Sequence, residues 1–86
     1  MAWNIQIEDR AEKSLERLSK TAQISIINFL DKLAIQDNPR FQGKALTGNY
    51  SGQWRYRVGD YRVICRIQDK QVTVLVLDIG HRKDIY

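Results

Sequence analysis

Five side chains in the C-terminal part of the chain are candidates for binding phosphate or moving a proton. They are Arg57, Arg62, His81, Arg82 and Tyr86. A guanidinium group matches two phosphate oxygens at once, and imidazole and phenol groups can exchange a proton without a metal. When a ribose 2′-hydroxyl attacks the neighbouring phosphorus, RNA cleavage needs a base, an acid and cations that stabilise the phosphorane. These residue types therefore predict metal-independent cleavage of RNA, provided that the fold brings them together.

Other chemistries fit the sequence less well. The chain has one histidine and one cysteine, which offer zinc too few ligands. Its glycines at 43, 48 and 52 are not followed by the Gly-Lys-Ser/Thr ending of a phosphate-binding loop. We therefore expect no metal and no cofactor. Each candidate also has a plainer interpretation: exposed arginines usually form a solvated face, His81 can be an ordinary surface histidine, and Tyr86 can anchor the end of the chain.

Composition bounds the size and the environment of the protein. Its 86 residues suffice for one domain, residues 1–86, and carry a formal net charge of +4. A basic chain favours an acidic partner, either nucleic acid or an acidic protein. A single cysteine fits a reducing compartment, and neither an apolar run of membrane-spanning length nor a secretory signal is present in the sequence. We expect a cytoplasmic protein without membrane contact.

A hairpin must position the arginines. On both sides of Gly59-Asp60 apolar residues alternate with polar ones, which predicts two strands, 53–58 and 61–68, joined by a two-residue turn. Such a turn fixes the register and places Arg57 opposite Arg62. Like charges in direct opposition destabilise a sheet, so we infer that an anion normally lies there. One face of this hairpin, the predicted arginine face, carries Arg55, Arg57, Arg62 and Arg66 and is interrupted only by Ile64.

The remaining elements follow from periodicity and capping residues. We expect a first strand at 2–8, a helix capped by Asp9, a second helix from Thr21 to about residue 36, a glycine-punctuated loop at 40–51 and a last strand at 71–79. The last strand is apolar on both sides, which suits an interior strand or one covered by a partner. The order β-α-α-β-β-β predicts an α+β fold, an antiparallel sheet with a two-helix hairpin packed on one face.

The last strand completes the predicted site. If its turn also has two residues, Cys65 lies opposite Val74 and Arg62 opposite Leu77. Continued past Gly80, this register brings His81 onto the arginine face. The strand leaves the sheet at the end where the two facing arginines meet, so the five candidates are expected to converge in one patch. The arginine face then also carries Thr73, Leu75, Leu77 and Ile79.

Three segments resemble a known family. Gly-Lys-Ala-Leu-Thr-Gly at 43–48, Trp-Arg-Tyr-Arg-Val-Gly-Asp-Tyr-Arg-Val-Ile at 54–64 and Gly-His-Arg-Lys-Asp-Ile-Tyr at 80–86 are similar to the RelE branch of the RelE/ParE toxin superfamily. Members are the toxins of type II toxin–antitoxin systems, and they share the predicted order of elements. The resemblance implies a ribosome-dependent endoribonuclease that cuts mRNA in the ribosomal A site. It also implies a cognate antitoxin, which we expect to be acidic and to lay a helical segment on the toxin.

The resemblance also implies roles for single residues. Arg55 and Arg57 match paired basic positions of the family, Arg62 matches a phosphate-binding arginine, and Lys44 matches an RNA contact before the second strand. Arg66 joins the RNA-binding residues because it shares the predicted arginine face.

The proton-transfer roles stay open between two residues. Arg82 matches an arginine proposed as acid or transition-state stabiliser, and Tyr86 matches a tyrosine proposed as base or base-orienting group. His81 matches a histidine that only some members have. Because a neutral imidazole has a lower pKa than a phenol, we hypothesise that His81 and Tyr86 share the duty of moving the proton.

Two other functions remain compatible with the sequence. The ParE branch has the same fold but poisons DNA gyrase, and its members usually lack the complete His-Arg…Tyr ending seen at 81–86. An inactive member that only binds its antitoxin is the third possibility.

Overall fold

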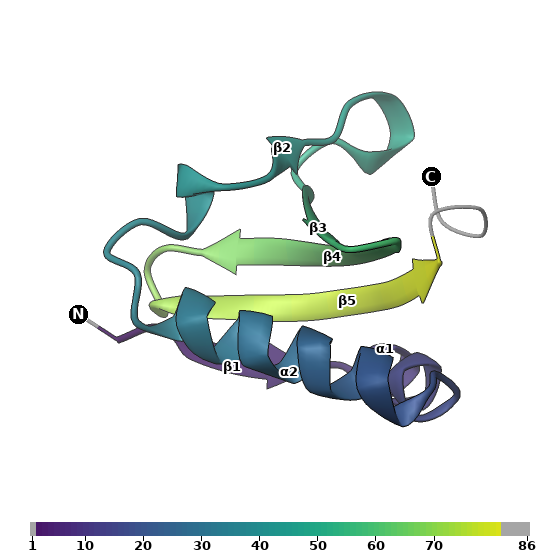
Figure 1. Cartoon of the computed structure of the whole chain (residues 1–86). Coiled ribbons are helices and arrows are strands. Elements are labelled where there is room, and N and C mark those ends of the chain that lie inside the picture. Colours follow the sequence, from purple (N-terminus) through teal and green to yellow (C-terminus); the bar gives the residue numbers. More distant parts are fainter. Residues whose placement is uncertain (1, 82–86) are drawn as a thin grey trace.

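A five-stranded sheet forms the body of the molecule (Figure 1). The computed structural model describes residues 2–81. The elements are β1 (Asn4–Ile7), α1 (Asp9–Glu16), α2 (Lys20–Ala34), η1 (Pro39–Phe41), β2 (Lys44–Ala45), η2 (Gly48–Tyr50), β3 (Trp54–Val58), β4 (Tyr61–Gln68) and β5 (Thr73–His81), where η marks a 3₁₀ turn. Strands lie in the order β1-β5-β4-β3-β2. The predicted α+β class is confirmed, and β5 is an interior strand.

One detail of the sheet differs from the expected antiparallel arrangement. β1 pairs with β5 in parallel, with Ile5 opposite Val74, while the other neighbours are antiparallel. A tight turn forces antiparallel pairing, but β1 is connected to the rest of the sheet through both helices, so no turn fixes its direction. The sheet is therefore mixed.

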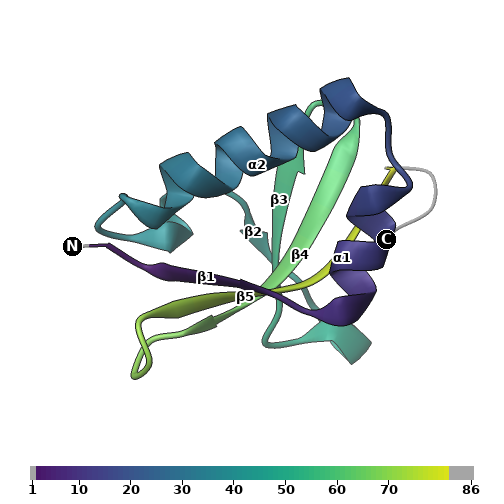
Figure 2. The same ribbon diagram turned by 90° about the horizontal axis from the view of Figure 1, so that it is seen from below.

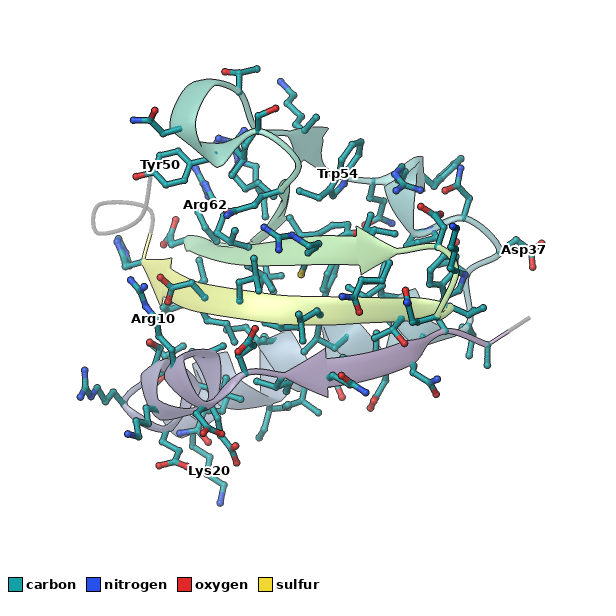
Figure 3. The ribbon with its side chains drawn as sticks, turned by 180° about the vertical axis from the view of Figure 1, so that it is seen from behind. Arg10, Lys20, Asp37, Tyr50, Trp54 and Arg62 are labelled. Carbon is teal, nitrogen blue, oxygen red and sulfur yellow. The ribbon has the colours of Figure 1, made fainter. Side chains whose placement is uncertain are left out.

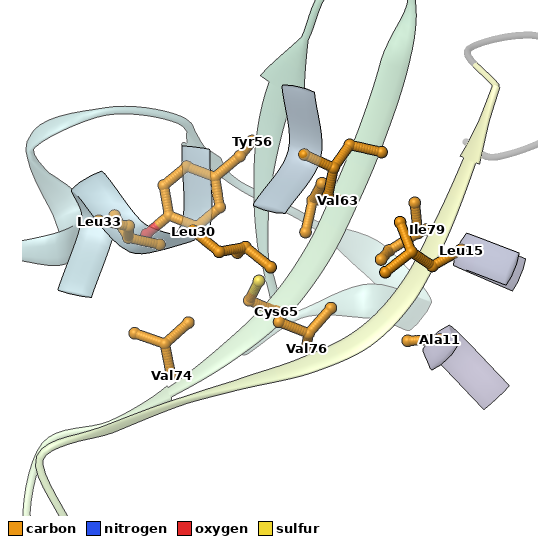
Figure 4. Packing of buried hydrophobic residues seen from close by; sticks show 11 residues of the cluster. Ala11, Leu15, Leu30, Leu33, Tyr56, Val63, Cys65, Val74, Val76 and Ile79 are labelled. Carbon is orange, nitrogen blue, oxygen red and sulfur yellow. The ribbon is translucent and has the colours of Figure 1, made fainter. Parts of the chain in front are cut away.

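The core lies between the helices and one face of the sheet (Figure 4). Each fully buried valine, leucine or isoleucine side chain there stabilises the fold by about 1.5–3 kcal/mol. Ala11 and Leu15 of α1 and Leu30 and Leu33 of α2 pack against the sheet. The sheet contributes Tyr56, Val63, Cys65, Val74, Val76 and Ile79 to this cluster.

Both helices begin at residues other than those predicted. Ser19, not Thr21, caps α2, since its hydroxyl accepts a hydrogen bond from the amide of Ala22 at 3.2 Å. Glu8 occupies the capping position of α1 without a side-chain cap, and Asp9 is the first helical residue. An acidic residue in the first turn still interacts favourably with the helix dipole. The predicted helix positions are thus confirmed, with caps shifted along the chain.

The β3–β4 and β4–β5 hairpins differ in how well the predicted register holds. In β3–β4, Arg57 lies opposite Arg62, as predicted. In β4–β5 the turn spans residues 69–72. The ladder also contains a bulge: Cys65 pairs with Val76, but its neighbour Ile64 pairs with Asp78. The predicted pairs Cys65–Val74 and Arg62–Leu77 are therefore wrong.

The predicted loop at 40–51 contains structure of its own. β2 pairs with β3, so that Lys44 lies opposite Arg55. Beyond it, the η2 turn lies on the side of the sheet away from α2 (Figure 2). The arginine face is only partly open to solvent, because just 8% of Arg62 and none of Ile64 are exposed.

Candidate functional site

A basic cluster lies where β2 meets β3. It consists of Lys44, Arg55 and Arg57, and Lys44 and Arg55 are direct partners across the two strands. Two other arginines form ion pairs: Arg10 with Asp78 at 3.1 Å, and Arg40 with Asp69 at 2.8 Å. Within residues 2–81, no side chain of the basic cluster has a hydrogen bond or an ion pair. Three uncompensated cations at one place predict an anionic ligand.

Arg55 carries the strongest sign of a missing partner. Its Nε is buried and has no hydrogen-bond partner among the residues that the structure describes. Buried donors are nearly always satisfied, so such an atom calls for a ligand or water. Beside it lies a hollow of about 190 Å³ lined by Gln42, Gly43, Lys44, Arg55, Tyr56 and Arg57. A phosphate group fits the size and charge of this hollow.

Glycine at position 43 lets the chain approach β3 closely. Its φ is +83°, and a Cβ there would lie 2.5 Å from both the carbonyl oxygen of Arg55 and Nε1 of Trp54. Any side chain would therefore push β2 away from β3. Gly43 keeps Lys44 beside Arg55.

Aromatic side chains hold the segment that carries Lys44. Nε1 of Trp54 donates to the carbonyl of Gln42 at 2.7 Å, and the Tyr56 hydroxyl donates to the carbonyl of Pro39. Burial raises the pKa of Tyr56, so its phenol stays a neutral donor. The sequence identified Trp54 and Tyr56 only as core residues, and their donor role was missed. A buried aromatic with a polar tip could have suggested it.

The bulge moves His81 away from its predicted place. Arg62 lies opposite Gly80 and Tyr61 opposite His81. Direct partners point to the same side of a sheet, so His81 lies on the side of Tyr61, not on the arginine face as predicted. The two rings meet edge to face, with centroids 5.6 Å apart and planes at 85°. Ile79 likewise lies in the core and not on the arginine face.

Arg62 and His81 nevertheless lie at the same end of the sheet. Figure 3 shows Arg62 near the end of β5, with Arg10 and Tyr50 at the same end. Arg66 is exposed on β4, opposite Leu75 and farther from this end. Arg82 and Tyr86 lie outside the described residues, so their predicted convergence with the other candidates stays a prediction.

Asp78 is a carboxylate that sequence reasoning missed. The bulge turns it to the arginine face, opposite Ile64. One of its oxygens accepts the amide hydrogen of Ile79 at 2.9 Å, and the other lies 3.1 Å from the Arg10 guanidinium. Arg10 thus offsets a negative charge that would otherwise lie near Arg62.

Other kinds of site find little support among residues 2–81. No group of three or more metal-binding side chains occurs there. Burial raises the pKa of the Cys65 thiol to about 12, so it stays protonated and unreactive at neutral pH. No helix in this part of the chain combines the length and the apolar character needed to cross a membrane.

Comparison with known proteins shows the family of the chain. The model of a family described as the ParE toxin of type II toxin–antitoxin systems, parDE, matches residues 5–86. The chain belongs to this toxin family. It is also similar to the toxin RelG of Mycobacterium tuberculosis, with 29% identity over 86 residues that span 100% of this chain and 98% of the relative. Since the similar proteins carry RelE-type names, the predicted resemblance to the RelE branch is confirmed.

Two solved structures are similar over nearly the whole chain. A chain of the toxin–antitoxin complex RelBE2 from Mycobacterium tuberculosis has 27% identity and a TM-score of 0.87, covering 98% of this chain and 95% of that one. A chain of the archaeal RelE–RelB complex from Pyrococcus horikoshii has 27% identity and a TM-score of 0.76, covering 99% and 100%.

Proposed function

We propose that this toxin is a ribosome-dependent, metal-independent endoribonuclease that cleaves mRNA and is neutralised by a cognate antitoxin. The basic cluster carries the proposal. Lys44, Arg55 and Arg57 lie together without ion pairs in the described chain, and the buried Arg55 Nε lacks a partner. RNA supplies a row of phosphates, and their negative charges compensate the positive charges of such a cluster. On this proposal the protein acts in the cytoplasm, where ribosomes and mRNA are found.

The proposed reaction needs no group beyond RNA and protein. The ribose 2′-oxygen loses its proton to a base and bonds to the neighbouring phosphorus, and the 5′-oxygen of the next nucleotide departs with a proton from an acid. Arg57 and Arg62 face one another across β3 and β4 and are the proposed phosphate ligands. His81 and Tyr86 are the proposed proton carriers, and Arg82 is the proposed stabiliser of the phosphorane charge.

The proposed partner besides the ribosome is an antitoxin. Both similar solved structures are toxin–antitoxin complexes, by their descriptions. The net charge of +4 favours an acidic partner, which would compete with RNA for the basic surface. Co-purification with the product of the adjacent gene tests this partner.

Salt dependence tests the RNA contacts. Arg57→Ala and Arg62→Ala are each expected to reduce the salt dependence of ribosome binding by about one charge. Arg17→Ala removes the same charge from the exposed end of α1 and serves as the control. Equal slopes in all three variants would refute the proposed phosphate contacts.

The family description keeps gyrase poisoning as the second candidate function, since it names a ParE toxin. Brief expression in cells separates the two. Primer extension should show cuts at in-frame positions of translated messages, whereas a ParE-like toxin would leave mRNA intact and produce gyrase-linked DNA breaks. A chain that does neither but still binds an antitoxin is an inactive member.

A further inference from the structure

Tyr61 and His81 make a ring contact at the end of the sheet. The two residues are direct partners at the last pair of the β4–β5 ladder, and their rings meet edge to face at 5.6 Å and 85°. We propose that Tyr61 is a positioning residue that holds the His81 imidazole at this end of the sheet. Its catalytic meaning rests on the function proposed above.

Tyr61 is itself well anchored. It lies opposite Val58 on β3 and packs against the hydrophobic core. His81, by contrast, is half-exposed at the end of its strand. An edge-to-face aromatic contact stabilises one ring orientation over others that a terminal side chain would sample. Tyr61 therefore transmits the order of the core to the imidazole.

The pairing of Tyr61 with His81 also sets where His81 lies relative to Arg62. Tyr61 and Arg62 are consecutive, so one points to the helix side and the other to the arginine face. Their partners are His81 and Gly80, and Gly80 brings no side chain against Arg62. Arg62 and His81 therefore lie in neighbouring pairs of the ladder, on opposite sides of the same end of the sheet.

A spectroscopic test is direct because the chain has a single histidine. In NMR spectra, the His81 ring protons should show cross-relaxation with the Tyr61 ring and a ring-current shift. Tyr61→Phe should keep both signals, and Tyr61→Leu should lose them. Phe41→Leu, which changes an exposed aromatic outside the site, is the matched control and should change neither.

Cleavage kinetics on programmed ribosomes complete the test. Tyr61→Leu should lower kcat about tenfold, the upper range for loss of one aromatic contact, with little change in KM. Tyr61→Phe and the Phe41→Leu control should both cleave at the wild-type rate. Thermal unfolding of each variant shows whether it is folded, and the contact in the wild-type protein can be measured without any variant.

Each of the following results would refute one part of the proposal. Absent cross-relaxation in the wild-type protein removes the contact and the proposal with it. Equal loss of activity in Tyr61→Phe and Tyr61→Leu would show that the hydroxyl acts, not the ring. Wild-type cleavage by His81→Ala would show that no positioned imidazole is needed. A wild-type protein that cleaves nothing refutes the proposed nuclease and the positioning role, whereas the NMR signals would still report the contact.

Discussion

The β3–β4 and β4–β5 hairpins are built differently although they share β4. β3 and β4 are joined by Gly59 and Asp60, and their five pairs follow one another without interruption. β4 and β5 are joined by residues 69–72, with Val72 at a φ of +49°, and a bulge interrupts the ladder. The first hairpin keeps Arg57 and Arg62 together, while the second decides which side His81 occupies.

A β5 strand with this bulge has a lower free energy than a regular β5 strand would have. Side chains alternate between the two faces of a regular strand. With Val76 in the core, Asp78 would then also lie in the core and Ile79 on the opposite face. Burying an unpaired carboxylate costs several kcal/mol, and exposing an isoleucine loses about 1.5–3 kcal/mol more. With Leu77 as the extra residue, Val76 and Ile79 both lie in the core and Asp78 reaches Arg10. A bulge disrupts only one step of the ladder.

The largest expected effect tests this bulge. Ile79→Ala should lower the free energy of unfolding by about 2–5 kcal/mol, because Ile79 is buried. Asp78→Ala should cost less, about 1–2 kcal/mol, because it removes one ion pair with a largely exposed Arg10 and one hydrogen bond from the amide of Ile79. Urea unfolding measures both. A regular strand would give the reverse order.

The turn of the first hairpin should respond next. Gly59 has a φ of +60°, which costs other residues about 1–2 kcal/mol, and a Cβ there meets nothing within 4 Å. Gly59→Ala should therefore destabilise by that conformational cost alone, and Gly59→Asn by less. Thermal unfolding checks this, with Asp60→Ala as the control. Equal stability of Gly59→Ala and the wild-type protein would contradict the turn geometry.

The second turn should respond in the opposite direction. Val72 is a β-branched residue with a positive φ, a strained combination. Val72→Asn should raise the free energy of unfolding by up to about 1 kcal/mol, since asparagine tolerates this conformation. Calorimetry measures the gain. Destabilisation by this variant would mean that packing of the valine outweighs its backbone strain.

The smallest effect is a dependence on pH. Two hydrogen bonds from Arg40 lower the pKa of Asp69 below its ordinary value of 3.8. Its contribution to stability is thus present above pH 3.8 and is lost as the pH falls through the lower, folded pKa. Asp69→Asn should reduce the acid dependence of the unfolding temperature below pH 4, roughly. Identical acid profiles would show that the pair adds nothing.

Local patterns were enough to predict much of this fold. The alternation around Gly59-Asp60 predicted β3, β4 and the opposition of Arg57 and Arg62, because a two-residue turn leaves one register. Contacts between distant segments could not be predicted in this way. The segment before β2 is held to β3 by hydrogen bonds from the Trp54 and Tyr56 side chains to the carbonyls of Gln42 and Pro39. That loop by itself shows only glycine and polar residues.

The sequence by itself determined which residues carry charge, where the helices and the main strands lie, and which two arginines face each other, since these depend on neighbours close along the chain. The tertiary structure decided the parallel pairing of β1, the isolated buried Arg55 Nε and the side of the sheet on which His81 lies. The physical reason is that these features depend on what the core accepts. Keeping Ile79 inside and Asp78 outside required one extra residue in β5, and that residue turned His81 toward Tyr61.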